Sequence, residues 1–411
     1  MAWAEDFISA VESGSVNLDS VPAREEASSK IFAVLADVSS IKTQQDDAIF
    51  RLLAACRVFM RDRRGIYQLL SIEALERFLV IAESESWVSS VREEALMCMV
   101  NSVYMRPDFV SEHLIARHFI ARLLGLARTK GTFSLHRLVW KFLLVSCEAR
   151  EVPQHVSCSL EAWQLIFSTL SYGFKHGKMS DNVTGARVLL LMDLIKVISV
   201  LANEMQWTAK QEEVSPDIFH YIFRLGELLL DILCFEHPRV YRLDDHLVDL
   251  KNKVTEVFML LPGSLLAALI QQRHKETDGF GKCSLLSPVV KHLQTMLLNV
   301  RVEKTRPLSE MLPTLIVCHN LAKTGEHEIL GCFKMTILPS FQPSKAYFDA
   351  HEQAKTFYFN HLKSFLTCLD TDVRRYTSEW LFLLCDQNAK VYTQHTGIGN
   401  AIGLLRMKGL A

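Results

Sequence analysis

Apolar residues recur along most of the chain with the spacing of one helix face. Between residues 217 and 235 the apolar positions lie three or four residues apart: Ile218, Tyr221, Ile222, Leu225, Leu228, Leu229 and Ile232. The stretches 47–61 and 373–384 repeat this spacing, and alternating strand patterns are nearly absent. Such spacing is typical of amphipathic helices packed against a core. The pattern predicts an all-α fold.

Signals for helix ends agree with this prediction. Ser215 precedes Pro216 and Asp217, which is the order expected at a capped helix N-terminus. Ser90 and Glu93 have the spacing of a capping box. Several prolines fall between the periodic segments, where they can end helices at little cost. At the usual helix lengths the segments amount to roughly eighteen to twenty helices joined by short links.

The helical segments recur in pairs and triplets about every 40 residues, the period of armadillo and HEAT units. Such units bury a face only by stacking on their neighbours, and the stack leaves a long concave groove. We predict a single armadillo/HEAT-like right-handed α-solenoid over residues 1–411. Two or three separate bundles remain an alternative, because residues 205–214 and 271–283 are polar enough to be linkers or surface loops.

Composition narrows the choice of partner and compartment. The net charge of -1 and the pI of about 6.9 give no electrostatic footprint for nucleic acid or an anionic membrane. The most apolar run, 188–202, is interrupted by Asp193 and Lys196, so we expect no membrane span. The first residues lack the basic and apolar regions of a signal peptide. Ten scattered cysteines without a CxxC pair indicate small buried hydrophobes in a reducing compartment. We therefore expect a soluble cytoplasmic protein.

A search for catalytic chemistry returns little. His327-Glu328 and His351-Glu352 each lack the second histidine that a helical zinc site needs. The glycines between Gly397 and Gly403 suggest a phosphate loop, but they do not follow a strand, which favours a tight turn before the last helix. We predict that the protein is not an enzyme and has no metal or cofactor. An enzyme would need a cluster of perturbed titratable groups, and a deep polar pocket in the structure would revive that hypothesis.

Two local features suit partner binding. Arg57, Arg61 and Arg64 are spaced to share one face of a helix, beside the apolar face. They could hold carboxylates in bidentate contacts or form a solvated basic face near Asp62. Asn101 lies in an apolar helical segment, where its amide could be satisfied internally or could bind a partner's backbone. For the arginines and for Asn101, the spacing alone does not decide between partner binding and a purely structural role.

The C-terminal region resembles the synembryn family, also called the resistance-to-inhibitors-of-cholinesterase proteins. The resemblance rests on LDTDVRR at 369–375, EWLFLLC at 379–385 and TGIGNAIGLL at 396–405. Weaker similarities follow in the same order through 337–339, 196–197, 142–144, Asn101 and 57–63. This order covers nearly the whole chain.

The resemblance implies an armadillo/HEAT-type solenoid that binds α subunits of heterotrimeric G proteins. Synembryns act as folding chaperones for new α subunits and as non-receptor exchange factors that promote GDP release. Their concave groove takes the C-terminal helix of the α subunit. Arg57, Arg61 and Asn101 match positions of that groove, and Phe142 is a further candidate contact. A calcium-sensor protein is a second candidate partner, and we expect a monomer that can be recruited to the cell cortex or plasma membrane.

This chain also departs from the family. Family members continue into an acidic, phosphorylatable segment and a further helix, whereas residues 1–411 hold only the repeat domain. We expect the α subunit's terminal helix to dock without such a tail. Exchange activity is expected to depend on the tail. The alternative function is a generic armadillo-like scaffold for another helical peptide, without exchange activity.

Overall fold

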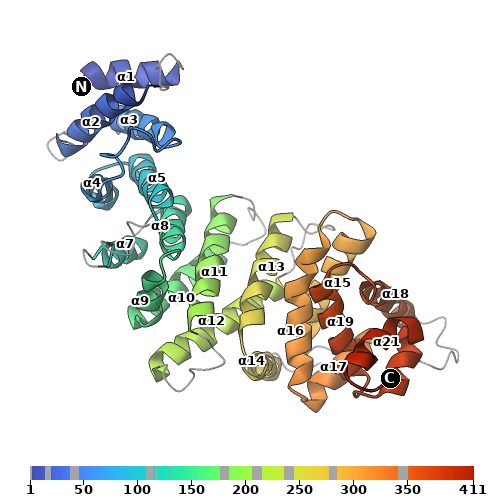
Figure 1. Ribbon diagram of the computed structural model, residues 1–411. Coiled ribbons are helices and arrows are strands. Elements are labelled where there is room, and N and C mark those ends of the chain that lie inside the picture. The colour runs from blue at the N-terminus through green and yellow to red at the C-terminus, as the bar shows by residue number, and fades with distance from the viewer. Residues whose placement is uncertain are drawn as a thin grey trace. The chain divides into compact units, whose positions relative to one another are not determined.

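The computed structural model describes helices throughout the chain (Figure 1). The described residues are 2–13, 20–37, 46–107, 114–115, 118–129, 131–175, 185–205, 215–235, 245–276, 285–340 and 350–411. They form 20 α-helices, a short π-helix and a 3₁₀-helix, and no strand occurs among them. The predicted all-α fold is confirmed.

Residues 1–205 and 206–411 form two compact units. Within unit 1, the main packing partners of each helix lie one to three helices away along the chain, as in the stacking of helical repeats. The assignment of residues 1–411 to one continuous domain stays a prediction. The helices of unit 1 are α1 (Ala2–Glu12), α2 (Val21–Asp37), α3 (Asp46–Phe59), α4 (Ile72–Glu83), α5 (Ser89–Met105), α7 (Phe119–Arg128), α8 (Phe133–Ser146), α9 (Glu151–Ser157), α10 (Leu160–Lys175) and α11 (Ala186–Glu204).

Four helices of unit 1, namely α3, α5, α8 and α11, form its central layer, each packed on the next (Figure 1). The other helices of the unit cover them; α4 packs on α5, α7 on α8, and α9 and α10 on α11. Trp140 and Phe142 of α8 are buried in this core together with Trp163 of α10. The central layer is therefore held mainly by apolar burial, which stabilises roughly in proportion to area.

Unit 2 is organised around α16, which packs against α13, α14, α15, α17 and α19. Its core includes the edge-to-face pair of Phe333 and Trp380, with ring centroids 5.4 Å apart. Its helices are α12 (Pro216–Cys234), α13 (Asp245–Leu260), α14 (Gly263–Glu276), α15 (Ser287–Leu297), π-helix η5 (Leu298–Val302), 3₁₀-helix η6 (Leu308–Met311), α16 (Leu312–Lys323), α17 (His327–Ile337), α18 (Ala350–Phe365), α19 (Thr371–Leu384), α20 (Ala389–Thr396) and α21 (Ile398–Met407).

The predicted helix starts meet different outcomes. The Ser215 hydroxyl accepts a hydrogen bond from the Ile218 amide at 3.3 Å, and Pro216 opens α12, as predicted. The capping box at Ser90 is wrong. Helix α5 begins at Ser89 after Val88, and no side chain caps it. Glu93, the expected partner of Ser90, instead accepts a hydrogen bond at 2.5 Å from the Thr132 hydroxyl at the start of α8, so a contact between helices replaces the local one.

The expected loops are only partly described. Residues 271–276 belong to α14, which corrects the prediction of a loop from 271 to 283. The polar end of α14 bonds to a neighbouring helix, because Gln272 donates to Glu227 of α12 at 3.0 Å and Arg273 pairs with Asp231 of α12. Residues 206–214 and 277–284 lie outside the described part of the chain. In the helices that are described, none has an apolar stretch long enough to cross a membrane.

Candidate partner-binding surface

The turn after α3 fixes the position of Arg61. Helix α3 ends at Phe59, so Arg61 and Arg64 do not continue its face, and the predicted three-arginine stripe on one helix is wrong. Arg24 of α2 ends the helix by donating hydrogen bonds to the carbonyl oxygens of Phe59 at 3.0 Å, Asp62 at 2.5 Å and Arg64 at 2.6 Å. Helices need such partners for their last carbonyls.

Gly65 completes this turn. Its φ is +69°, a conformation that favours glycine. A Cβ added there would lie 2.7 Å from the Cβ of Arg24, so a side chain has no room. Arg24 and Gly65 together fix this turn. The Arg61 side chain on it is exposed and has no partner among the described residues. Arg64 pairs with Asp62 at 2.6 Å instead.

Arg57, in the last turn of α3, bridges to α5. Its Nε donates to the Glu94 carboxylate at 2.5 Å. The Arg57 side chain is 38% exposed, whereas that of Glu94 is 3% exposed. The pair thus has a buried acidic half and an accessible basic half. Arg57 is held in a fixed orientation while part of its guanidinium remains open to a partner.

Asn101 lies on the narrow solvent-facing stripe of α5. The exposed and half-buried positions of this helix follow three-four spacing through Glu93, Met97, Asn101 and Tyr104, and nearly all its other residues are buried. Asn101 is half-buried, and its amide forms no hydrogen bond with any residue that the structure describes. No described residue therefore satisfies the Asn101 amide. Its donor and acceptor groups are available to a partner.

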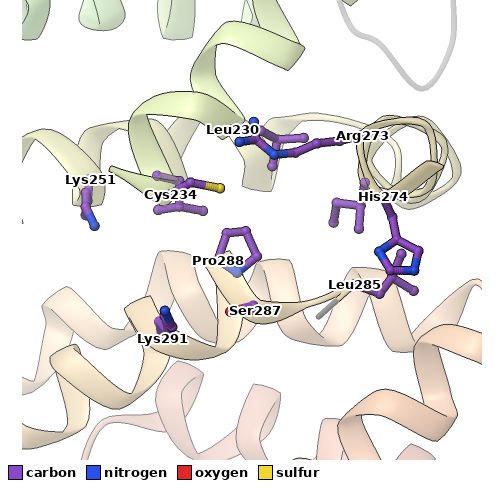
Figure 2. A pocket seen from close by; sticks show the side chains of 11 residues that line it. Leu230, Cys234, Lys251, Arg273, His274, Leu285, Ser287, Pro288 and Lys291 are labelled. Atoms are coloured by element: carbon purple, nitrogen blue, oxygen red, sulfur yellow. The ribbon is translucent and has the colours of Figure 1, made fainter. Parts of the chain in front are cut away.

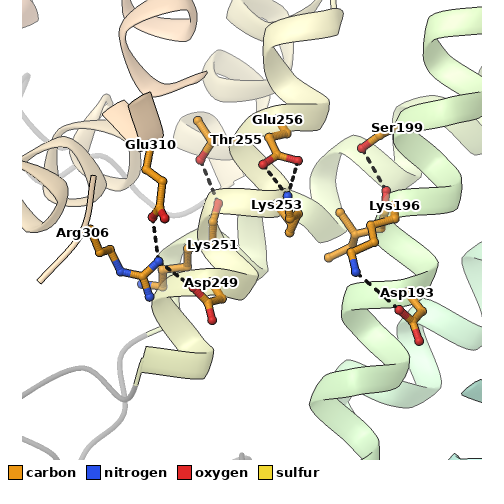
Figure 3. Close-up of polar contacts among 11 residues, drawn as sticks. Asp193, Lys196, Ser199, Asp249, Lys251, Lys253, Thr255, Glu256, Arg306 and Glu310 are labelled. Carbon is orange, nitrogen blue, oxygen red and sulfur yellow. Dashed lines mark hydrogen bonds and ion pairs between the residues drawn. The ribbon is translucent and has the colours of Figure 1, made fainter. Parts of the chain in front are cut away.

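Helices α8 and α11 carry similar stripes. The stripe of α8 runs through Arg137, Lys141 and Leu144, and that of α11 through Leu189, Met192, Lys196, Val200 and Asn203. Buried Asp193 joins the two helices, because it pairs with Arg137 of α8 at 3.0 Å and with Lys196 of α11 at 3.6 Å (Figure 3). We call the stripes of α5, α8 and α11, together with Arg57 and Arg61, the central-helix surface.

The central-helix surface combines positive charge with apolar side chains. Arg57, Arg61, Arg137, Lys141 and Lys196 supply its basic groups. Tyr104 is 65% exposed, and Met97, Leu144 and Val200 are half-buried along the same stripes. Such a surface suits an amphipathic helix that carries acidic groups beside its apolar face. No group of three or more metal-binding side chains occurs in the described part of the chain.

Phe142 was a predicted contact that the structure argues against. Its side chain is 0% exposed within α8, where the neighbouring helices surround it. A side chain with no accessible surface cannot touch a partner unless the core opens. Sequence reasoning also missed Arg137, Lys141, Lys196 and Tyr104. The one available signal was Asp193 with Lys196, polar residues three apart in the most apolar run of the chain.

Comparison with known proteins identifies the family. Residues 52–411 match the Ric8 family, described as guanine nucleotide exchange factor synembryn. This match includes α5, α8 and α11 and most of α3. The chain belongs to the Ric8 family. The family predicted from residues 369–385 and 396–405 is thereby confirmed. In the latter segment, Gly397 (φ +87°) forms the turn that leads into α21, and Gly399 and Gly403 lie within that helix.

Several curated Ric8 relatives are named Chaperone Ric-8A. The Mus musculus protein is 47% identical over 380 residues, and the alignment covers 87% of this chain and 68% of that protein. The Gallus gallus protein is 43% identical over 389 residues with the same coverage. The Macaca fascicularis protein is 25% identical over 386 residues. The family is described by nucleotide exchange, and these relatives are named for a chaperone role.

One solved structure, titled Crystal structure of Uso1-2, aligns with a TM-score of 0.47 and 13% identity. The alignment covers 93% of this chain and 60% of that chain. A likeness at this level bears on neither the function nor the site.

Proposed function

We propose that this chain binds α subunits of heterotrimeric G proteins, acting as a folding chaperone and as a non-receptor guanine nucleotide exchange factor. Membership of the Ric8 family over residues 52–411 is the observation that carries the proposal. The central-helix surface supports it, because accessible basic groups and half-buried apolar groups on parallel stripes fit an amphipathic helix laid across them. The C-terminal helix of the α subunit is the proposed occupant.

The surface assigns different tasks to its residues. The exposed guanidinium groups of Arg57 and Arg61 would hold carboxylates in charge-assisted hydrogen bonds, each worth about 1.5–3 kcal/mol. The Asn101 amide would pair with backbone groups at an end of the bound helix, where they lack intrahelical partners. Met97, Leu144 and Val200 would pack on its apolar face. Phe142 takes no part in this proposal.

Nucleotide exchange then follows from thermodynamic linkage. A protein that binds the nucleotide-free α subunit more tightly than the GDP-bound form must weaken GDP binding by the same factor. GTP, which favours the closed α subunit, would discharge the complex. No group transfer is required of this chain, so the proposal needs no catalytic residue or cofactor.

Arg61→Glu tests the surface with little risk to the fold, because Arg61 is exposed and its side chain has no intramolecular partner among the described residues. Titration of the full chain with a peptide of the α subunit's C-terminal helix should show at least about tenfold weaker binding for the variant. Lys30→Glu on α2 is the matched control, since Lys30 is exposed and lies outside the central-helix surface. It should bind as the parent does.

Two further outcomes separate the functions. Acceleration of GDP loss from a GDP-loaded α subunit by the parent protein would support exchange, whereas binding without acceleration would contradict exchange by residues 1–411 and leave the chaperone function. Failure to bind either the α subunit or its terminal peptide would contradict the proposal and favour a scaffold for a different helical peptide. Binding that Arg61→Glu leaves unchanged would keep the partner but move the site away from the central-helix surface.

A further inference from the structure

Two arginines of the central-helix surface are held in the same way. Arg57 of α3 donates from its Nε to the carboxylate of Glu94 on α5 at 2.5 Å. Arg137 of α8 donates from its Nε to the carboxylate of Asp193 on α11 at 3.0 Å. Both acids are buried, with side chains that are 3% and 10% exposed. We call Arg57 and Arg137 the anchored arginines, because each is fixed to a buried acid of the next central helix.

The anchored arginines use only part of their guanidinium groups. Their terminal nitrogens, Nη1 and Nη2, donate no hydrogen bond to any residue that the structure describes. Unlike a terminal nitrogen of Arg92, they are also not among the buried nitrogens without a partner. The terminal nitrogens of Arg57 and Arg137 are therefore reached by solvent. Two parallel N–H groups at the free end of a guanidinium match the two oxygens of a carboxylate.

Each anchored arginine belongs to a group of two cations and one buried acid. Lys196 shares the Asp193 carboxylate with Arg137, at a distance of 3.6 Å (Figure 3). Arg61 follows Arg57 by four residues, and no described residue pairs with its side chain. Each group keeps one positive charge beyond what its acid neutralises. A carboxylate from a partner would balance it, and the attraction is stronger beside a protein surface than in bulk water.

The other side chains of the stripes do not change this balance. Glu93 on α5 and Lys141 on α8 add one charge of each sign. Met97 and Leu144 are half-buried on the same two stripes, where they would contact the apolar face of a bound helix. The carboxylates that suit this surface therefore belong beside the anchored arginines.

Helix packing sets the separation of the anchored arginines. Arg57 and Arg137 lie on α3 and α8, which are two steps apart in the central layer, with α5 between them. Packed helices lie about 8–10 Å apart, so two steps make about 16–20 Å. A helix laid across the layer rises 1.5 Å per residue and covers this distance in about eleven to thirteen residues. Eleven residues make about three turns, which returns to the same face.

We propose that Arg137 forms a second carboxylate site equivalent to Arg57, and that the two select a partner helix with carboxylates about three turns apart on one face. This inference rests on the proposed function, because it needs a helix on the central-helix surface, and it adds where that helix carries its acids. Asp193 is a positioning residue. It holds Arg137 with its terminal nitrogens toward solvent and does not itself touch the partner.

Two designed peptides test the spacing. Both are amphipathic helices of equal length, composition and net charge, with leucines on one face. The wide peptide carries two glutamates about three turns apart, and the narrow peptide carries them about one turn apart. Calorimetric titration of the full chain should show at least about fivefold tighter binding of the wide peptide. Equal affinities, tighter binding of the narrow peptide, or no binding of either would overturn the proposal.

Arg137→Gln should remove this preference by weakening the wide peptide to about the affinity of the narrow one. Arg150→Gln is the matched control, since Arg150 is 77% exposed, pairs with Glu204 at 3.8 Å and lies outside the central-helix surface. It removes the same charge from unit 1 and should keep the preference. Circular dichroism checks that both variants are folded. A preference that survives Arg137→Gln would overturn the second site.

Asp193→Asn separates positioning from net charge. This change removes a negative charge, so a surface that worked by net charge alone would bind both peptides more tightly. Positioning predicts the opposite, with the wide peptide weakened about threefold or more, because an amide holds the Arg137 guanidinium less firmly than a carboxylate does. Asp193→Glu keeps the carboxylate and should keep most of the preference. Tighter binding by Asp193→Asn would overturn the positioning role.

A peptide of the α subunit's C-terminal helix distinguishes this inference from the proposed function. If that peptide fails to bind while the wide peptide is preferred, the proposed function is contradicted and the paired carboxylate sites stand. If it binds while the parent protein does not prefer the wide peptide, the proposed function stands and the paired sites are overturned.

Discussion

Basic residues are used differently in the two units of this protein. In unit 1, Arg57 and Arg137 reach across helix boundaries to carboxylates, and their exposed sides lie along open stripes. In unit 2, Lys251, Arg273 and Lys291 line one pocket (Figure 2), and Arg273 pairs with Asp231 beside it. Open stripes suit an elongated partner that replaces water over many residues.

The two units also differ in which member of an ion pair is buried. The buried half of the Arg57–Glu94 pair is the acid, and the exposed half is the base. In unit 2 the less exposed group is the base: the Arg306 side chain is 11% exposed, and it pairs with Asp249 at 2.6 Å and Glu310 at 2.8 Å (Figure 3). Removing the exposed partner of a buried charge should therefore cost more than removing the buried charge itself.

Arg24→Ala should have the largest effect on stability. It would also loosen the turn after α3 that presents Arg61 in the central-helix surface. It removes the hydrogen bonds to three carbonyl oxygens and the stacking of the guanidinium on the Phe59 ring, whose centroid is 4.4 Å away. We expect a loss of about 3 kcal/mol in the free energy of unfolding, measured by urea denaturation.

Arg63→Ala is the control for this change, because Arg63 is an exposed residue of the same turn. It should change the free energy of unfolding by less than about 0.5 kcal/mol. Equal losses in the two variants would show that Arg24 does not hold the turn.

Acidification should act next most strongly, through His292 of unit 2. The pKa of His292 is about 3 in the folded protein because of burial and the nearby Lys251 and Arg306, against about 6.5 when unfolded. Both states hold the neutral ring above pH 6.5. Below it the unfolded state binds the proton first, so stability falls as the pH drops toward 3. The expected loss at pH 5 is about 2 kcal/mol.

Urea denaturation at pH 7 and pH 5 measures this loss. His292→Leu should reduce the difference between the two pH values by most of the 2 kcal/mol or so assigned to this residue. His155→Leu should not, because His155 is exposed on α9. An unchanged pH dependence in His292→Leu would show that the ring is not buried in its neutral form.

The Arg57–Glu94 pair gives the smallest effect and the sharpest comparison between its two halves. Arg57→Met strands a carboxylate that is 3% exposed, whereas Glu94→Gln leaves a guanidinium that water can still reach. We expect a loss of about 2 kcal/mol for Arg57→Met and about 1 kcal/mol for Glu94→Gln in urea denaturation. The reverse order would contradict the assignment of the buried half.

Much of the architecture was predictable from local sequence. The three-four spacing in 217–235 predicts α12 (Pro216–Cys234) to within about one residue at each end. A helix that buries one face must repeat apolar residues at the helical period. The Ser215 cap was also predictable, because donor and acceptor lie three residues apart. Likewise, the segments at 369–385 and 396–405 were enough to indicate the family.

The candidate site was predictable only in part. Arg57, Arg61 and Asn101 were named from the sequence, and the structure leaves each of them an accessible polar group. Phe142 could not be told from a surface residue, because α8 has apolar residues both on its buried faces and on its exposed stripe. Burial is a property of the helices that surround a residue.

By itself, then, the sequence determined the helices, the all-α class and the family, since periodicity, caps and motifs act over a few residues of chain. The tertiary structure alone decided where α3 ends, through Arg24, whose bonded carbonyls lie 35 to 40 residues later. It also decided that Arg57 meets Glu94 and that Arg137 meets Asp193, 37 and 56 residues away. Ion pairs and pockets depend on distances in space, which helix packing sets and local pattern does not record.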